Sequence, residues 1–234
     1  MKNFVGFDYS LKLHQLDFIA REMMRVENKR ELYDLVEQYL MADIGGSEAR
    51  KKARTVLFKI WVSVPPEHVR VRDRALQLFA DASQEERLVL HWGLILMAYP
   101  FFREMAEQAG KLLHIQGEFS SLQLGRKMRA LYGEREKVRV ATKKILQTWR
   151  NFHVIIPQEK VYIANKFHVT NPFLKPWLCE SYLLATGKAG VELNRLGEEL
   201  SLFPFQISLS EHELKDNDRF RLIYGQGSVK VAIR

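Results

Sequence analysis

The chain has little of the chemistry that marks secreted, zinc-bound or membrane-spanning proteins. Its single cysteine, Cys179, excludes an internal disulfide framework and leaves a thiolate zinc site without a second sulfur ligand. The longest apolar run, residues 88–102, covers 15 residues and is too short to span a bilayer comfortably. The N-terminus lacks the charged and then apolar pattern of a secretory signal. These absences predict a cytoplasmic protein with no membrane contact.

Recognisable catalytic motifs are also missing. A zinc-protease pattern begins at His212 but has Asp216 where the second histidine belongs, and Gly187-Lys188 lacks the spacing of a phosphate-binding loop. The Gly225-Gln226-Gly227 segment leads into a predicted strand rather than a helix, so it does not fit a dinucleotide fingerprint. We therefore expect no catalytic residue, no metal and no cofactor. The enzymatic alternative is a metal-dependent nuclease, whose carboxylates would be dispersed along the chain.

What the sequence does contain is a globular composition, with 47% hydrophobic and 27% charged residues. Apolar residues at helical spacing dominate the first two thirds, and short β-prone runs appear after residue 150. Ser47 is a plausible N-cap, and Ser83 with Glu86 has the spacing of a capping box. We predict helices over residues 10–43 (two), 48–63, 67–82, 84–99 and 174–185, and strands over residues 205–209, 220–224 and 229–233.

The positive charge is concentrated in two segments. The net charge of the chain is +8, yet residues 111–150 alone sum to +7 and residues 47–74 to +5, while the remaining segments together sum to −4. A concentrated excess of lysine and arginine calls for an anionic partner, whereas a diffuse excess only improves solubility. Nucleic acid, an acidic protein and a membrane surface are the candidate partners, but neither segment has the large apolar face that membrane binding needs.

Residues 101–163 have the element order of a winged helix-turn-helix. A helix over 101–113 is followed by a second helix that Ser120 or Ser121 caps and Gly133 ends, with Leu122 on its buried face. A third helix, from about residue 134 to 152, carries an apolar face, and a hairpin with Lys160 at its turn would be the wing. The predicted fold is mainly α, with a helical N-terminal domain (1–99), a winged helix-turn-helix-like module (100–170), and a C-terminal helix plus β-strands (171–234).

The third helix also carries a basic and polar stripe, which makes it the predicted recognition helix. Arginine and lysine neutralise phosphates or bind guanine edges, and glutamine can bind adenine. The residues that we expect to reach the groove, or to lie beside it, are Arg135, Lys137, Arg139, Lys143, Lys144 and Gln147. The second helix would contact the DNA backbone through Arg126, Lys127 and Arg129. The alternatives are a solvated helix face, and RNA or an acidic protein as the partner.

The other basic segment offers a second phosphate-contacting surface. Arg50 and Arg54 lie one helical turn apart with Lys51 beside them. An equally good interpretation is a charged face that the acidic segment 75–110 balances.

The order of these features resembles one known family. The basic helix beginning Ser47-Glu48-Ala49-Arg50, the long apolar helix and the segment from Val140 to Phe152 are similar to BrxA, the small DNA-binding component of BREX phage-defence systems. The similarity covers residues 10–165 and extends more weakly to Phe203-Pro204-Phe205 and the final hairpin. It implies a bacterial accessory protein that binds double-stranded DNA without modifying it, beside other defence-system proteins. The runner-up function is an RNA-binding or scaffold component.

Overall fold

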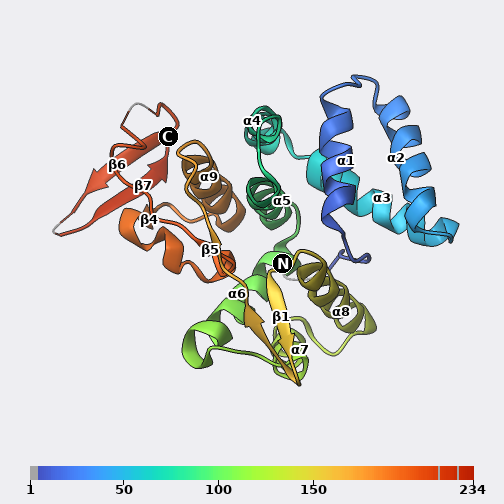
Figure 1. Cartoon of the computed structure of the whole chain (residues 1–234). Helices are drawn as coiled ribbons and strands as arrows, with labels where there is room; N and C mark the ends of the chain where they lie inside the picture. The colour runs from blue at the N-terminus through green and yellow to red at the C-terminus, as the bar shows by residue number, and fades with distance from the viewer. Residues whose placement is uncertain (1–4, 216, 226) are drawn as a thin grey trace.

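The computed structural model describes residues 5–215, 217–225 and 227–234, and it is mainly helical with a small C-terminal strand element, as predicted (Figure 1). The N-terminal part contains α1 (Leu13–Met23), α2 (Lys29–Asp43), α3 (Ser47–Trp61), the 3-10 turn η1 (Pro66–His68), α4 (Val69–Phe79) and α5 (Gln84–Ala98). The middle contains α6 (Pro100–Gln116), α7 (Ser121–Tyr132), α8 (Glu136–Asn151), β1 (Ile155–Gln158) and β2 (Val161–Ala164). The remainder contains β3 (Phe167–His168), α9 (Leu174–Thr186), β4 (Val191–Glu192), η2 (Leu193–Glu198), η3 (Leu200–Leu202), β5 (Phe205–Gln206), β6 (Phe220–Tyr224) and β7 (Val229–Ile233).

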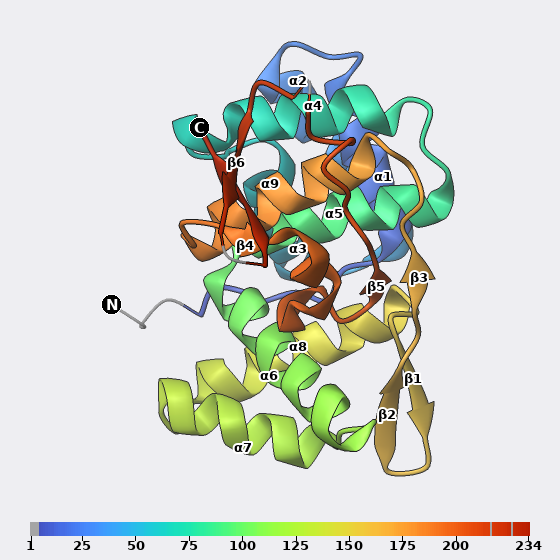
Figure 2. The same ribbon diagram turned by 90° about the vertical axis from the view of Figure 1, so that its left-hand side faces the viewer.

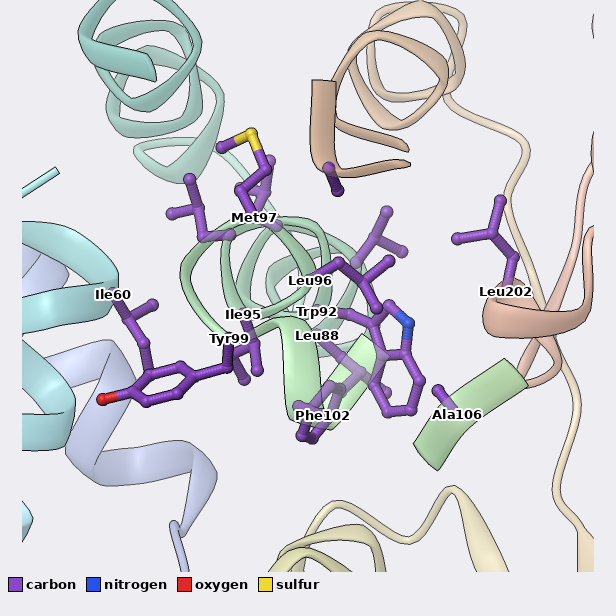
Figure 3. Packing of buried hydrophobic residues seen from close by; sticks show 14 of the residues in the cluster. Ile60, Leu88, Trp92, Ile95, Leu96, Met97, Tyr99, Phe102, Ala106 and Leu202 are labelled. Carbon is purple, nitrogen blue, oxygen red and sulfur yellow. The ribbon is translucent and has the colours of Figure 1, made fainter. Parts of the chain in front are cut away.

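Helix α5 forms the centre of the molecule. The predicted capping box starts it, because the Ser83 hydroxyl accepts from the Glu86 amide and the Glu86 carboxylate accepts from the Ser83 amide. Every residue from Leu88 to Met97 is buried, as expected for a helix that is apolar on all sides. Figure 3 shows side chains of α5 and α6, Trp92 and Phe102 among them, packed together with Leu202 of η3 on the facing side. None of the helices that the structure describes is long and apolar enough to cross a membrane.

Two glycines allow the C-terminal part of the chain to approach this centre closely. A Cβ atom on Gly93 would lie 2.7 Å from the Trp177 ring of α9, so α5 and α9 pack at short range. A Cβ atom on Gly110 of α6 would lie 2.0 Å from the Leu200 carbonyl oxygen, so η3 rests on the α6 backbone. The Trp92 indole N–H donates to the Ser201 carbonyl at 3.0 Å and fixes the same contact. The C-terminal segment is therefore part of the core.

The helices α6, α7 and α8 gather with the β1–β2 hairpin at one end of the molecule (Figure 2). Ser120 is the cap of α7, since its hydroxyl accepts from the Gln123 amide, and Gly133 ends the helix at a φ of 84°. The hairpin pairs Ile155 with Ala164 and Gln158 with Val161, and Lys160 lies in its turn as predicted. The Phe119 backbone, between α6 and α7, pairs with Tyr162 of β2 through two hydrogen bonds. The hairpin is thus tied to the helices.

The C-terminal strands form two small sheets. The predicted β6–β7 hairpin is present, with Phe220 opposite Ile233, and β4 pairs with the other edge of β7. The predicted strand over residues 205–209 is shorter than expected. Only Phe205 and Gln206 pair, in parallel with β3, because β3 itself offers two residues. Beyond Gln206 the chain continues without a strand partner.

Two local predictions were wrong. Ser47 is the first residue of α3 rather than its N-cap, because the Gly46 carbonyl already accepts the first helical hydrogen bond from Arg50. Leu122 was expected on the buried face of α7 but is 56% exposed, since it faces an open cleft beside α8 instead of the core. One cluster of buried side chains runs through all three predicted domains, so no break in the core marks the boundaries after residues 99 and 170.

A buried polar contact joins α1 to α5. The His91 Nε2 lies 2.8 Å from the Asp17 carboxylate, and Arg87 lies 3.6 Å from the other oxygen. The His91 Nδ1 has no hydrogen-bond partner among the described residues, which suits a neutral ring that donates from Nε2. Burial lowers the pKa of His91 below its ordinary value of 6.5. Burial alone would raise the pKa of Asp17, but the hydrogen bond from His91 and the nearby charges, those of Arg87 and Arg21 among them, together outweigh it, and the net shift is downward.

The α6–η3 contact predicts a large cost for a single methyl group. In Gly110→Ala, the added Cβ would meet the Leu200 carbonyl, and relieving that clash should lower the free energy of unfolding by about 1–3 kcal/mol or more. Gly45→Ala is the control, because no atom lies within 4 Å of its Cβ position, and its effect should stay within about 0.5 kcal/mol. Urea denaturation measures both. Equal stability of the two variants would contradict the close approach.

The His91–Asp17 contact predicts acid sensitivity. The pKa of His91 is lower in the folded protein than in the unfolded chain, so the unfolded chain binds an extra proton when the pH falls below 6.5. The stabilising contribution of neutral His91 is therefore fully present above pH 6.5 and is lost as the pH falls below that value. The stabilising contribution of Asp17 is lost at more acidic pH, as the pH falls from its ordinary pKa of 3.8 through its lower folded value. Urea denaturation at about pH 7.5 and about pH 5 should show the first loss. The glutamine in His91→Gln cannot titrate, so the stability of this variant should depend less on pH than that of the wild type. An equal pH dependence in both proteins would show that other groups cause the effect.

Candidate nucleic-acid interface

An open cleft of about 470 Å³ runs between α7 and α8 and reaches the hairpin, and we call it the α7 cleft. Its floor is apolar, with Leu122 of α7, Leu146 of α8 and Tyr162 of β2. Four cationic side chains line it together with this floor: Arg129, Arg139, Lys143 and Arg150. No carboxylate belongs to its lining among the described residues. The cleft is therefore a concave surface of one charge sign.

Helix α8 places its two faces as the sequence predicted. The apolar face consists of Val138, Ala141, Ile145, Trp149 and Phe152, each with no more than 1% exposure. Trp149 packs against Trp92, Phe102 and Phe203 with ring centroids 5.3–6.2 Å apart. A helix anchored by such a large indole has little freedom to tilt. Its opposite face is held at a fixed position toward solvent.

Three residues of the predicted stripe lie together in the α7 cleft: Arg139, Lys143 and Gln147. Arg135 does not join them, because it is the residue before α8 and its Nε donates to the Tyr132 carbonyl at 3.1 Å. Lys137 is exposed in the first turn of α8 and Lys144 is half-buried, and both lie outside the cleft. The structure therefore brings the middle and end of the stripe together and leaves its beginning apart.

One of these cations has an internal partner. Arg139 donates to the Glu136 carboxylate at 2.5 Å and 2.8 Å, and this pairing raises the pKa of Arg139 and lowers that of Glu136. Both side chains are exposed, so the pair can exchange for another anion at small cost. No described carboxylate forms an ion pair with Lys143 or Arg150.

The predicted backbone contacts on α7 are divided. Arg129 lines the α7 cleft, where its Nε lies 3.6 Å from the exposed carboxylate of Glu134. Arg126 is exposed and Lys127 is half-buried, and neither side chain reaches the cleft. Arg129 is thus the one member of this group that the structure joins to the stripe on α8.

The second basic segment is largely occupied by internal contacts. Arg50 donates to Glu37 at 2.7 Å and to the carbonyls of Ile44 and Gly45 at 2.9 Å. Arg54 also pairs with Glu37 and lies over the Tyr33 ring, 3.8 Å from its centroid. The two arginine side chains are only 13% and 11% exposed. The two arginines link α3 to α2 through Glu37. The neighbouring Lys51 is exposed to solvent.

Sequence reasoning missed Arg150, which the structure places in the same cleft. The predicted stripe stepped by four residues throughout, and such a row drifts around a helix that has about 3.6 residues per turn. A mixed spacing of four and three from Arg139 leads to Lys143, Leu146 and Arg150, which share one face. A stripe drawn with the true helical period would therefore have predicted Arg150 from the sequence.

The described residues contain no group of three or more histidine, cysteine, aspartate or glutamate side chains that could hold a metal ion. Asp216 of the failed protease motif and Gln226 of the failed dinucleotide motif lie outside the described residues. No protein family, curated protein or solved structure matches the chain.

The internal pairing of Arg50 and Arg54 predicts a structural role for Glu37. Glu37→Gln would leave two mostly buried guanidinium groups without their carboxylate, and should lower the free energy of unfolding by about 2 kcal/mol. Glu136→Gln removes an equivalent partner from the exposed Arg139 and should leave the stability unchanged. Thermal and urea unfolding of both variants test this contrast. A Glu37→Gln variant as stable as the wild type would contradict the structural role of this pairing, and both arginines would again be candidates for phosphate contacts.

Proposed function

We propose that this protein binds double-stranded DNA without enzymatic activity, with α8 as the element that enters the groove. The observation that carries the proposal is the α7 cleft, where four cationic side chains and no carboxylate of the described residues line one concave surface. Duplex DNA presents one negative charge per about 1.7 Å of its axis, so a row of cations releases several counterions on binding. Such a surface also attracts acidic proteins, but a duplex offers it a denser and more regular row of negative charges.

The order and pairing of the elements support a winged helix-turn-helix interpretation. The chain runs from α6 through the Phe119 bridge to α7, α8 and the β1–β2 hairpin. In a helix-turn-helix, the second helix of the pair lies in the major groove and the first crosses the backbone. Here α8 would lie in the major groove and α7 would cross the backbone. The hairpin would be the wing, with Lys160 at its tip.

The anchoring of α8 favours binding in energetic terms. A recognition helix that is already fixed loses little conformational entropy when it meets the DNA. The indole of Trp149 fixes the buried face, and the Thr142 and Thr148 hydroxyls each donate to a carbonyl one turn earlier, so neither is left unsatisfied. The exposed face then presents Lys143 and Gln147 in a preset geometry.

The resemblance to the BrxA family supports the same proposal and suggests its setting. A bacterial phage-defence system of the BREX type would supply the other proteins that work on the DNA, with this chain as a small accessory that holds it. The expected cytoplasmic location, the absence of a cofactor and contacts with defence-system proteins all belong to this proposal.

Removal of two cations from the α7 cleft should weaken duplex binding. Arg139→Gln combined with Lys143→Gln should lower the affinity and reduce the slope of log K against log salt by about 2, one unit per lost phosphate contact. Lys230→Gln is the matched control, since it removes an exposed lysine from β7, away from the cleft, and should bind as wild type does. Salt-dependent fluorescence anisotropy with a labelled duplex measures all three proteins.

Other nucleic acids and added metal distinguish the competing functions. An unchanged duplex affinity in the folded double variant would overturn the role of the α7 cleft. Tighter binding to single-stranded RNA than to duplex DNA would favour the RNA-binding function. Cleavage of the duplex that depends on a divalent metal would favour the nuclease.

A further inference from the structure

A second cleft, of about 620 Å³, lies on the other side of the C-terminal half of α8, and we call it the α1 cleft. The N-terminal turn of α1 and the start of the hairpin form its far wall. Its cationic and titratable lining consists of Lys12, His14, Arg150 and His153. Gln147 and Arg150 line both clefts, so they form the ridge between them.

The far wall of the α1 cleft is fastened directly to α8. The Leu11 amide donates to the Thr148 hydroxyl at 2.9 Å, and the Asn151 side-chain amide donates to the Leu11 carbonyl at 2.7 Å. Leu11 itself is fully buried. These two hydrogen bonds hold the next residue, Lys12, at a fixed place relative to the ridge.

The two clefts that share Arg150 also share their charge sign. No carboxylate lines either of them among the described residues. Three other clefts of the molecule each include two carboxylates, such as Glu213 and Asp218 in the cleft between α4 and α9. One acid, Asp43, contacts its lining, since its carboxylate lies 3.4 Å from Lys12 and 3.0 Å from His14. Because Lys12 is half exposed, its ion pair with Asp43 can give way to a phosphate.

The dimensions of the ridge match those of a duplex groove. An α-helix with its side chains is about 10–12 Å across, and the major groove of B-form DNA is about 12 Å wide. Two clefts on either side of one helix therefore lie about as far apart as the two sugar–phosphate strands that border the groove.

We propose that the α1 cleft is a second phosphate-binding site, so that the two clefts hold the two opposite strands of one duplex while α8 lies in the groove between them. This inference rests on the proposed function and deepens it. Arg150, on the ridge, faces both strands, and Lys12 contacts the strand that the α7 cleft does not reach.

The test uses the wild-type chain and a duplex in which one strand carries neutral methylphosphonate linkages. If both strands are held, neutralising one strand should weaken binding about tenfold or more at low salt. If only one strand is held, the remaining charged strand suffices, and binding should change by no more than about twofold, the statistical loss of one of two orientations. The second result overturns the inference and leaves duplex binding intact. No binding to the unmodified duplex overturns the proposed function together with this inference.

A variant then assigns the second strand to its cleft. Lys12→Gln should weaken binding to the unmodified duplex by about threefold to tenfold, yet leave binding to the half-neutral duplex unchanged, because the contact that it removes is already lost there. The Lys230→Gln control should match wild type on both duplexes. A Lys12 variant that binds the unmodified duplex as tightly as wild type removes the α1 cleft from the interface.

Discussion

The close contact between α5 and the C-terminal part of the chain is the constraint on which the rest of the structure depends. Gly93 admits the Trp177 ring and Gly110 admits the Leu200 carbonyl, so α9 and η3 lie directly against the central helices. That approach brings Phe203 to Trp149 and closes the aromatic cluster that holds α8. The exposed face of α8 is therefore positioned by a contact on the opposite side of the helix.

The local features of this fold were predictable because they depend on residues close in the sequence. The capping box at Ser83, the apolar face of α8 and the turn at Lys160 all follow from short spacings. The contacts that decide the candidate site do not. Leu11 and Thr148 are 137 positions apart, and no periodicity pairs them. The cleft that exposes Leu122 depends on how α7, α8 and the hairpin are placed relative to one another, which the apolar pattern of a single helix does not reveal.

The two basic segments show why net charge is a poor guide to a binding surface. By sequence, the segments 47–74 and 111–150 differ little in positive charge. In the structure, Arg50 and Arg54 both form ion pairs with Glu37, and Arg74 pairs with Glu180 of α9. Lys143 and Arg150 have no such carboxylate among the described residues. What distinguishes the segments is the distance to acids on other elements, which only the fold determines.

The hydrogen bonds between Leu11 and α8 affect the order in which parts of the molecule fold. The first and second halves of the proposed interface come from opposite ends of a long stretch of chain, and contacts of such sequence separation form late in folding. During synthesis the α1 turn emerges early and must wait for Thr148 and Asn151 before its final docking. Most of the chain is therefore synthesised before the α1 turn can reach its final place on α8.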